Sequence, residues 1–346
     1  MTRPLRWGIL GTGNIAKQFG AGVRTGRRGV MTAIGSRSQA SADAYAKQFE
    51  IPAAHGSYES LLADETVDAI YVSLPNSMHH EWTIKALRAG KHVLCEKPFA
   101  MNAGEAEEMF DVAQKTGRVL VEAFMYRTHP QTKKLIELVH AGAIGELRVV
   151  RAHFCFNPTK TAGNIRFDAS LGGGALMDIG CYCVSYATFF AGSRPTNVFG
   201  VGHLHPTGVD DRVTGCIGFE NGVLASFVCG LSAHNDNTAF LCGSEGYIEI
   251  PYPWKPPEKS SFTVCRSAPP RMDNPTADAN GGKIIHPGPT RQVVEIDTGG
   301  VGLYGVESDA FAETVLDGAA PAVTREETLT NMRLLDTLRK QVGLPF

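Results

Sequence analysis

The segment that most constrains the fold is the glycine-rich turn Gly11-Thr-Gly-Asn-Ile-Ala16. A short apolar run, residues 5–10, precedes this turn, and a helix-compatible segment, residues 15–22, follows it. Strand, glycine turn and helix in this order form a dinucleotide-binding fingerprint, in which the helix N-terminus faces the phosphates. The first glycine permits the tight turn, and the second lets the backbone approach a pyrophosphate. The sequence therefore predicts a bound dinucleotide, with candidate contacts at Gly11, Thr12, Gly13, Asn14 and Ile15.

The segment after the second expected strand favours NADP over NAD. An NAD site usually places Asp or Glu at the end of this strand, here residues 30–35, to hold the ribose 2′-hydroxyl. This chain has Ser36, Arg37 and Ser38 there instead. A guanidinium flanked by hydroxyl groups suits a 2′-phosphate, and no carboxylate repels the phosphate. The alternative is a solvated Arg37 with a Ser38 that only caps a helix over residues 39–49.

Strands and helices alternate through the rest of the first half. Helices are expected at residues 58–62, 81–89 and 103–116, and strands at residues 67–74, 92–95 and 118–124. This alternation predicts an α/β fold, with a doubly wound parallel Rossmann sheet over residues 1–124. The turn after residues 67–74 adds candidate contacts to the nicotinamide ribose at Leu74, Pro75, Asn76 and His79. His79 could equally cap a helix or pack in the interior.

The strand at residues 92–95 ends abruptly in Glu96, Lys97 and Pro98. An open α/β sheet binds its ligands at the carboxyl ends of its strands. A lysine there can carry positive charge beside a cofactor, polarise a substrate oxygen, or tune a neighbouring acid or base. We therefore predict a catalytic role for Lys97 and cofactor contacts for Glu96 and Lys97. The alternative is a surface lysine just past a strand.

From residue 125 the pattern changes to α+β. Antiparallel runs are separated by turns such as Glu220-Asn221-Gly222. We expect strands at residues 146–156, 198–203, 214–219, 223–231, 237–241 and 247–250, and helices at residues 129–141, 175–191, 306–316 and 325–342. Residues 251–289 are rich in Pro, Gly and Ser and are expected to form a long irregular loop. The second domain, residues 125–346, is thus predicted to contain an open, largely antiparallel sheet.

Asp178 and Tyr182 lie four residues apart on the helix expected at residues 175–191, so their side chains share one face. A nearby ammonium such as Lys97 would favour the phenolate and bring the tyrosine pKa closer to neutrality. Tyr182 would then exchange a proton with a substrate oxygen, while Asp178 would hold a substrate hydroxyl or orient Lys97. The alternative is a capping Asp178 and a Tyr182 packed in a core.

Composition narrows the possible ligands. Charged residues make up 20% of the 346 residues and the formal net charge is −2, so no basic surplus indicates nucleic acid. No uninterrupted apolar stretch is long enough to span a membrane, and few residues precede the first strand, so a soluble, cytoplasmic protein is expected. The eight cysteines are scattered, and we expect reduced thiols and no structural metal.

Four motifs together resemble the glucose–fructose oxidoreductase/inositol dehydrogenase (Gfo/Idh/MocA) family. They are the glycine turn, Pro75-Asn76-Ser77-Met78-His79-His80, Glu96-Lys97-Pro98 and Gly172-Gly-Gly-Ala-Leu-Met-Asp-Ile-Gly-Cys-Tyr182. The resemblance covers nearly the whole chain and implies catalytic roles for Lys97 and Tyr182. It also implies a cis peptide bond between Lys97 and Pro98, and a homodimer or tetramer formed through the open sheet of the second domain.

Within that family the chain most resembles the dimeric dihydrodiol dehydrogenases and the NADP-dependent D-xylose dehydrogenases. This resemblance implies substrate contacts at Arg127, Phe154, Asp178 and Trp254. One departure is Met125, because the dihydrodiol enzymes carry a tryptophan two residues before the arginine. A sugar is therefore at least as plausible a substrate as an aromatic diol.

These observations lead to the hypothesis of an NADP-dependent oxidoreductase that transfers a hydride between nicotinamide and a small carbohydrate or diol. One alternative is an oxidoreductase of the glucose–fructose type that never releases its cofactor. An N-terminal arm would favour that alternative, whereas this sequence begins almost directly with the first strand. Another alternative is a sensor that binds dinucleotide or sugar without turnover, although a sensor has no need of Lys97, Asp178 and Tyr182 together.

Overall fold

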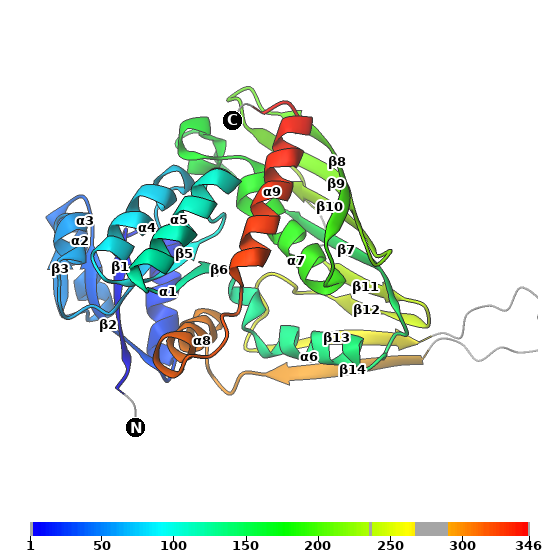
Figure 1. Cartoon of the computed structure of the whole chain (residues 1–346), viewed down its shortest axis with the longest axis horizontal. Helices are drawn as coiled ribbons and strands as arrows, with labels where there is room; N and C mark the ends of the chain where they lie inside the picture. Colours follow the sequence, from blue (N-terminus) through cyan, green and yellow to red (C-terminus); the bar gives the residue numbers. More distant parts are fainter. Residues whose placement is uncertain (1–2, 235–236, 267–289, 345–346) are drawn as a thin grey trace, which may run out of the picture.

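The computed structural model describes residues 3–234, 237–266 and 290–344, which form two sheets joined by helices (Figure 1). The first sheet has six parallel strands in the order β3-β2-β1-β4-β5-β6. Its strands are β1 (Leu5–Leu10), β2 (Gly29–Gly35), β3 (Ala53–His55), β4 (Ala69–Val72), β5 (His92–Glu96) and β6 (Leu120–Ala123). The Rossmann sheet predicted from the alternating pattern is confirmed.

Five helices follow strands of this first sheet. They are α1 (Asn14–Thr25), α2 (Gln39–Phe49), α3 (Tyr58–Leu62), α4 (His79–Arg88) and α5 (Ala103–Thr116). Side-chain caps start three of them: Ser38, Ser57 and Asn102 accept bonds from the N–H groups of Ser41, Ser60 and Glu105 at 3.4, 3.1 and 2.9 Å. Because helices cover both faces, the central strand β4 is apolar throughout and fully buried.

The second sheet has eight strands in the order β14-β13-β12-β11-β7-β10-β9-β8. Its strands are β7 (Leu147–Cys155), β8 (Pro195–Leu204), β9 (Asp210–Phe219), β10 (Leu224–Gly230), β11 (Ala239–Gly243), β12 (Gly246–Ile250), β13 (Lys259–Arg266) and β14 (Thr290–Asp297). The β7–β10 pair is parallel, and the other neighbouring pairs are antiparallel. The predicted open, largely antiparallel sheet is thus confirmed.

The expectation of an irregular loop over residues 251–289 is wrong in part. Residues 259–266 form strand β13, in which Ser260, Phe262 and Val264 are buried on one face. Their alternation was hidden by the prolines on either side. Strand β14 was missed because it is an exposed edge strand with a weak apolar pattern. The rest of the expected loop, residues 267–289, lies outside the described residues.

Helices connect the two sheets. They are α6 (Pro130–His140), a π-helix at Leu176–Gly180 that continues into α7 (Cys181–Ala191), α8 (Leu303–Asp317) and α9 (Arg325–Gln341). Helix α7 packs on β7 and β10, and α9 packs on both α7 and α5 (Figure 1). Helix α8 packs on α1 so closely that a side chain at Gly22 would lie 2.5 Å from Tyr304 Cβ. The last two helices therefore fix the first sheet against the second.

Within the described residues, one helical stretch, Ala169–Ala191, is long and apolar enough to cross a membrane. Its most apolar window is 83% buried inside the protein, and its α7 part packs on the second sheet. Burial in the core accounts for its apolar composition, as in many soluble proteins.

Candidate active site

The glycine turn has the geometry that a dinucleotide needs. Gly11 has φ 98°, which a side chain would strain, and a Cβ there would lie 3.1 Å from Leu74 Cδ2. A Cβ at Gly13 would meet no atom within 4 Å, so the backbone is open to a ligand on this side. No side chain caps the first amides of α1, and its first turn carries no acidic residue. Free N–H groups beside open space fit a pyrophosphate.

The segment after β2 carries positive charge. Ser36 is buried, whereas Arg37 and Ser38 are exposed. The Arg37 guanidinium acts on Tyr58: burial raises the pKa of Tyr58, and the neighbouring positive charge partly offsets this effect. Ser38 caps α2, which was the alternative considered for it. Its side chain is therefore engaged locally, and Arg37, although exposed, contacts the Tyr58 hydroxyl.

Strand β5 brings Lys97 to the carboxyl edge of the first sheet, where it meets Asp178 from the second half of the chain. The Lys97–Pro98 bond is cis, as the family resemblance implied. The Lys97 ammonium donates to the Asp178 carbonyl oxygen at 2.7 Å and to Asp178 Oδ1 at 3.2 Å. Two of its three N–H groups are thus engaged, which leaves one for another oxygen.

The Asp178 carboxylate lies between two cations. Its Oδ2 accepts a bond from Arg166 Nε at 2.5 Å, opposite the contact with Lys97. Burial favours the neutral acid, but Lys97 and Arg166 outweigh burial, and the pKa of Asp178 is lowered. Burial likewise opposes the charge of Lys97, but Asp178 reverses this and the pKa of Lys97 is raised. Both groups are therefore charged at neutral pH.

Asp178 and Tyr182 are joined by an unexpected backbone feature. Residues 176–180 form a π-helical turn rather than the regular α-helix that was predicted. Such wide turns are often found at functional sites. The Leu176 N–H at the start of this turn donates to Asp210 Oδ2 at 2.6 Å. Asp210 also excludes any side chain at Gly174, where a Cβ would lie 2.2 Å from Asp210 Oδ1. This glycine has φ 117°, a conformation that side chains rarely adopt.

Tyr182 lies in an aromatic cluster beside Lys97. Phe154 stacks on Trp254 with centroids 5.5 Å apart, and the Tyr182 ring lies 5.4 Å from Phe154 and 6.0 Å from Trp254. The Lys97 ammonium lies 5.1 Å from the centre of the Tyr182 ring. The tyrosine hydroxyl donates to Met125 Sδ at 3.3 Å, and a thioether is a weak acceptor. A substrate oxygen would offer this hydroxyl a better partner.

The expected fall in the pKa of Tyr182 toward neutrality is wrong for this structure. Tyr182 is 3% exposed, and burial raises its pKa well above the ordinary value, as does the negative charge of Glu96. The Lys97 ammonium faces the ring of Tyr182, whereas the hydroxyl points to Met125. Tyr182 is therefore a phenol at neutral pH.

Several predicted contact residues are engaged elsewhere. His79 is fully buried, and its two ring nitrogens lie 2.9 Å from the carbonyl oxygens of Leu74 and Pro98. Burial lowers the pKa of His79. His79 thus holds the backbone in place, in agreement with the packing alternative. Both ring nitrogens face carbonyl oxygens, so neither is available for the predicted ribose contact. Asn76 donates to the Gly172 carbonyl oxygen at 2.7 Å.

Arg127 and Glu96 are held by other residues of the protein. Arg127 pairs with Glu327 at 2.7 Å and lies 3.7 Å from the ring centre of Phe189. Glu96 accepts hydrogen bonds from the Tyr71 hydroxyl and, at 3.2 Å, from the Lys97 N–H. Both side chains are held by neighbours that are distant in the sequence.

Two cations at the site were missed in the sequence. Arg166 lies in a short 3-10 helix, Ile165–Phe167, before the glycine run, and Lys255 follows Trp254 directly. The charges of Lys97, Asp178 and Arg166 all act on the Lys255 ammonium. Neither cation belongs to a motif, and only the folded chain brings them beside Lys97.

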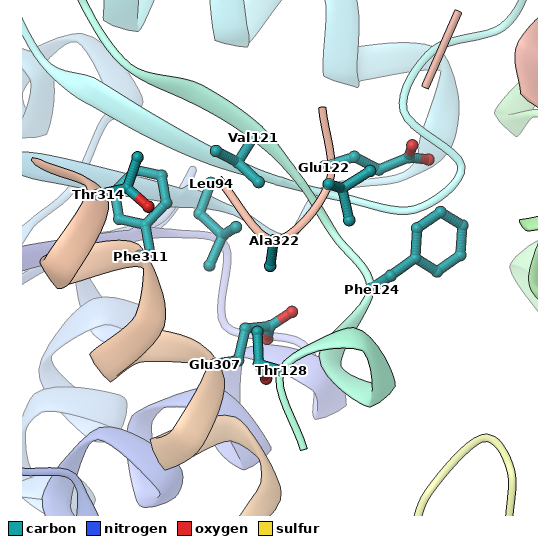
Figure 2. Close-up of a pocket in the computed structure, with 10 residues that line it drawn as sticks. Leu94, Val121, Glu122, Phe124, Thr128, Glu307, Phe311, Thr314 and Ala322 are labelled. Atoms are coloured by element: carbon teal, nitrogen blue, oxygen red, sulfur yellow. The ribbon is translucent and has the colours of Figure 1, made fainter. Parts of the chain in front are cut away.

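Buried carboxyl groups lie beneath the site. Glu122 from β6 and Glu307 from α8 line a small cavity of about 10 Å³ (Figure 2). Burial raises the pKa of Glu122 to about 8, although the N–H of Phe99 and the hydroxyl of Thr328 donate to its carboxylate. Burial and the nearby Glu96 raise the pKa of Glu307 well above its usual range. Both side chains thus favour the neutral acid.

Glu122 makes stability depend on pH. Its pKa rises from 4.5 in the unfolded chain to about 8 in the folded protein, so folding takes up a proton between these values. Stability should therefore fall as pH rises through this window, by up to about 1.4 kcal/mol per pH unit. Glu122→Gln should flatten this part of the curve, measured by urea unfolding, whereas Glu313→Gln at an exposed position should not. Equal slopes in the wild type and Glu122→Gln would contradict the assignment.

Comparisons with known proteins agree with this geometry. The profile of the oxidoreductase family with an NAD-binding Rossmann fold matches residues 5–124, and that of the Gfo/Idh/MocA C-terminal domain matches residues 132–249. A D-xylose 1-dehydrogenase (NADP(+)) from Haloferax volcanii is 35% identical over 96% of both chains. A trans-1,2-dihydrobenzene-1,2-diol dehydrogenase from Mus musculus is 37% identical over 73% of this chain and 77% of its own.

A solved structure extends the similarity to three dimensions. The 3-ketoreductase KijD10 from Actinomadura kijaniata, crystallised with NADP and TDP-benzene, has a TM-score of 0.84 and 31% identity over 98% of both chains. Aldose-aldose oxidoreductase from Caulobacter crescentus also has a TM-score of 0.84, with 26% identity over 98% of both chains. The motifs, the two sheets and these matches agree throughout the chain, which therefore belongs to the Gfo/Idh/MocA oxidoreductase family.

Proposed function

We propose that this protein is an NADP-dependent oxidoreductase that transfers a hydride between the nicotinamide and a carbon of a sugar-like or cyclic-diol substrate. The observation that carries the proposal is the meeting of Lys97, Asp178 and Tyr182 at the carboxyl end of β5, on the sheet that also carries the glycine turn. NADP, when bound, supplies or accepts the hydride. The chain itself supplies the charge and the proton.

The polar groups suit proton transfer to a substrate oxygen. Asp178 orients the Lys97 ammonium through two contacts, and the remaining N–H can polarise the oxygen. The Tyr182 phenol, which donates to the weak acceptor Met125 Sδ, can instead donate its proton to the same oxygen during reduction. In the oxidative direction the phenol must first lose that proton, which burial opposes.

The aromatic cluster supports a ring-shaped substrate. Phe154 and Trp254 present stacked rings beside Tyr182, and such faces pack well on the apolar face of a sugar or a cyclic diol. Relatives named as a D-xylose dehydrogenase and a dihydrodiol dehydrogenase span this substrate range. Met125 lies beside the Tyr182 hydroxyl, at the position where the dihydrodiol enzymes carry a tryptophan. Methionine is flexible and less bulky, so this position favours a sugar over an aromatic diol.

The test is to follow NADP(H) absorbance against aldoses, inositols, anhydro-sugars, dicarbonyls and cyclic diols in both directions, with NAD(H) in parallel. Turnover of one class with NADP(H) would support the proposal and name the substrate family. Absence of turnover with every class, combined with tight NADPH binding by fluorescence, would instead favour the sensor. Cofactor that co-purifies and does not exchange would favour the glucose–fructose type of enzyme.

Arg37 is proposed to select NADP through the 2′-phosphate. We expect Arg37→Ala to weaken NADPH binding by about 10- to 100-fold, because a bond between charged groups is worth about 1.5–3 kcal/mol. NADH binding should change little, and Arg88→Ala, an exposed arginine at the end of α4, should leave both unchanged. Fluorescence titration of the wild type and both variants, with NADPH and with NADH, measures the dissociation constants. An unchanged ratio of NADPH to NADH affinity in Arg37→Ala would remove this contact.

We also propose that residues 125–346 form the substrate-binding and oligomerisation domain, with residues 1–124 as the cofactor domain. The open face of the eight-stranded sheet exposes large apolar side chains at Phe199, Val201, Leu224 and Val293. A second copy of the chain would bury this face and yield a dimer or tetramer. A molar mass of a single chain in light scattering at micromolar concentration would refute this assembly.

A further inference from the structure

Lys255 is held at the edge of the aromatic cluster by its neighbour. It follows Trp254, whose ring stacks on Phe154 and whose Nε1–H donates to the His153 carbonyl oxygen at 2.8 Å. Trp254 is 3% exposed, so the backbone at this point is fixed, whereas Lys255 as a whole residue is exposed. The ammonium is thus carried by a rigid point between β12 and β13 and can reach ligands from solvent.

The surroundings of Lys255 leave its charge uncompensated. Crowding by neighbouring atoms and the positive charge of Lys97 lower the pKa of Lys255, whereas Glu96 and Asp178 act in the opposite sense. Asp178 is already shared by Lys97 and Arg166, and Glu96 is bonded to the Tyr71 hydroxyl. In the described part of the chain, Lys255 has no hydrogen bond and no ion pair of its own.

Arg166 adds a second unfilled donor group. Only its Nε bonds to Asp178, so the two terminal nitrogens have no partner among residues 3–234, 237–266 and 290–344. Its side chain is 40% exposed, and its guanidinium lies 5.5 Å from the ring centre of Phe156. Lys97 and Arg166 thus share the Asp178 carboxylate, and Lys255 lies near enough for their charges and that of Glu96 to act on it. Three cations meet two carboxylates, Asp178 and Glu96, so the site carries an excess of positive charge.

We propose that Lys255 and the terminal nitrogens of Arg166 bind an oxyanion group of the substrate, so that the preferred substrate is a phosphorylated or carboxylated sugar rather than a neutral one. This inference rests on the proposed function, because it assigns one end of the same substrate. An oxyanion would neutralise the two cations and form charge-assisted hydrogen bonds with both. The free amides at the start of α1 serve the cofactor pyrophosphate, so these two cations remain for the substrate.

The test compares ligands that differ in one charged group. With NADPH bound, D-glucose, D-glucose 6-phosphate and D-glucuronate are titrated by calorimetry into the wild type, Lys255→Gln and Lys255→Arg. We expect at least one anionic sugar to bind about tenfold tighter than glucose in the wild type. Lys255→Gln should lower this preference about tenfold, whereas Lys255→Arg should keep most of it. Lys259→Gln, an exposed lysine in the same segment, should keep the wild-type preference.

The two anionic ligands identify the source of the oxyanion. Preference for glucose 6-phosphate alone indicates a phosphate, and preference for glucuronate alone indicates a carboxylate; either supports the inference. Equal binding of all three sugars to the wild type, or an unchanged preference in Lys255→Gln, would overturn it.

Failure of the proposed function leaves a different pattern from failure of the inference. Charge-dependent binding that is lost in Lys255→Gln, with no hydride transfer to any sugar, would refute the oxidoreductase assignment and keep the oxyanion site. Turnover of neutral sugars without any preference for anionic ones would keep the oxidoreductase assignment and refute the oxyanion site. Calorimetry needs no turnover, so the two results are read independently.

Discussion

We expect Tyr182→Phe to lower kcat by about 10²–10⁴-fold, the usual contribution of a general acid or base. The substitution removes only the hydroxyl, and the ring keeps its contacts with Phe154 and Trp254. Among the described residues this hydroxyl bonds only to Met125 Sδ, at 3.3 Å, so its loss should change the free energy of unfolding by less than about 1 kcal/mol. The expected result is therefore an inactive protein of nearly normal stability.

Tyr186→Phe is the matched control. Tyr186 lies one turn further along α7, and its buried hydroxyl has no hydrogen-bond partner within the described residues. Both variants remove one buried phenol oxygen from the same helix. Steady-state kinetics and thermal melting should separate them, because only Tyr182 faces the proposed substrate oxygen. Similar activity in the two variants would rule out proton transfer by Tyr182.

The direction of the Tyr182 pKa shift adds a second signature. Because its folded pKa lies above the ordinary value, the phenol is the dominant form throughout the neutral range. Reduction uses that form and should stay constant until high pH, whereas oxidation needs the phenolate and should rise with pH. Any oxidation rate that remains in Tyr182→Phe should not rise with pH. An oxidation rate that is independent of pH in the wild type would contradict the assignment.

We expect Lys97→Met to lower kcat/KM by about 10²–10³-fold, the loss typical of removing one group that stabilises charge in the transition state. Methionine is unbranched and only one atom shorter than lysine, and it removes the charge and its donors. Asp178 would keep its ion pair with Arg166, so the carboxylate would not be left without a partner. NADPH binding should persist, because the amides at the start of α1 are untouched.

Lys85→Met serves as the control for the loss of a lysine. Lys85 lies on α4 of the same domain, pairs with Glu81 at 2.6 Å, and is exposed to solvent. NADPH titration by fluorescence and kinetics with the substrate found in the panel should give normal values for this variant. A Lys97→Met protein that binds NADPH and keeps its rate would remove Lys97 from the catalytic group.

Features defined by local pattern were predictable. The glycine turn, the alternation of strands and helices, and Lys97 at the end of β5 each depend on residues that are near one another in the sequence. Helices Gln39–Phe49 and Ala103–Thr116 begin and end where the pattern placed them, because a serine and an asparagine cap their starts. In the second half, the flanking prolines and the exposed edge hid β13 and β14, since a weak alternation cannot be distinguished from a loop.

The roles of buried polar groups depended on the tertiary structure. From sequence alone, His79 and Arg127 were candidate ligand contacts, yet the fold engages them with backbone carbonyls and with Glu327. The predicted direction of the Tyr182 pKa shift was wrong, because a pKa depends on burial as well as on the nearest charge.

The sequence by itself determined the Rossmann unit, the open second sheet and the family, because periodicity, turns and motifs are local properties of the chain. Only the tertiary structure brought Arg166 and Lys255 beside Lys97, from segments more than 65 residues away on the chain. Their positions follow from how the second sheet packs against the first through α7 and α9. Burial and charge pairing arise only when such distant segments meet, and they decide which polar residues remain available to a ligand.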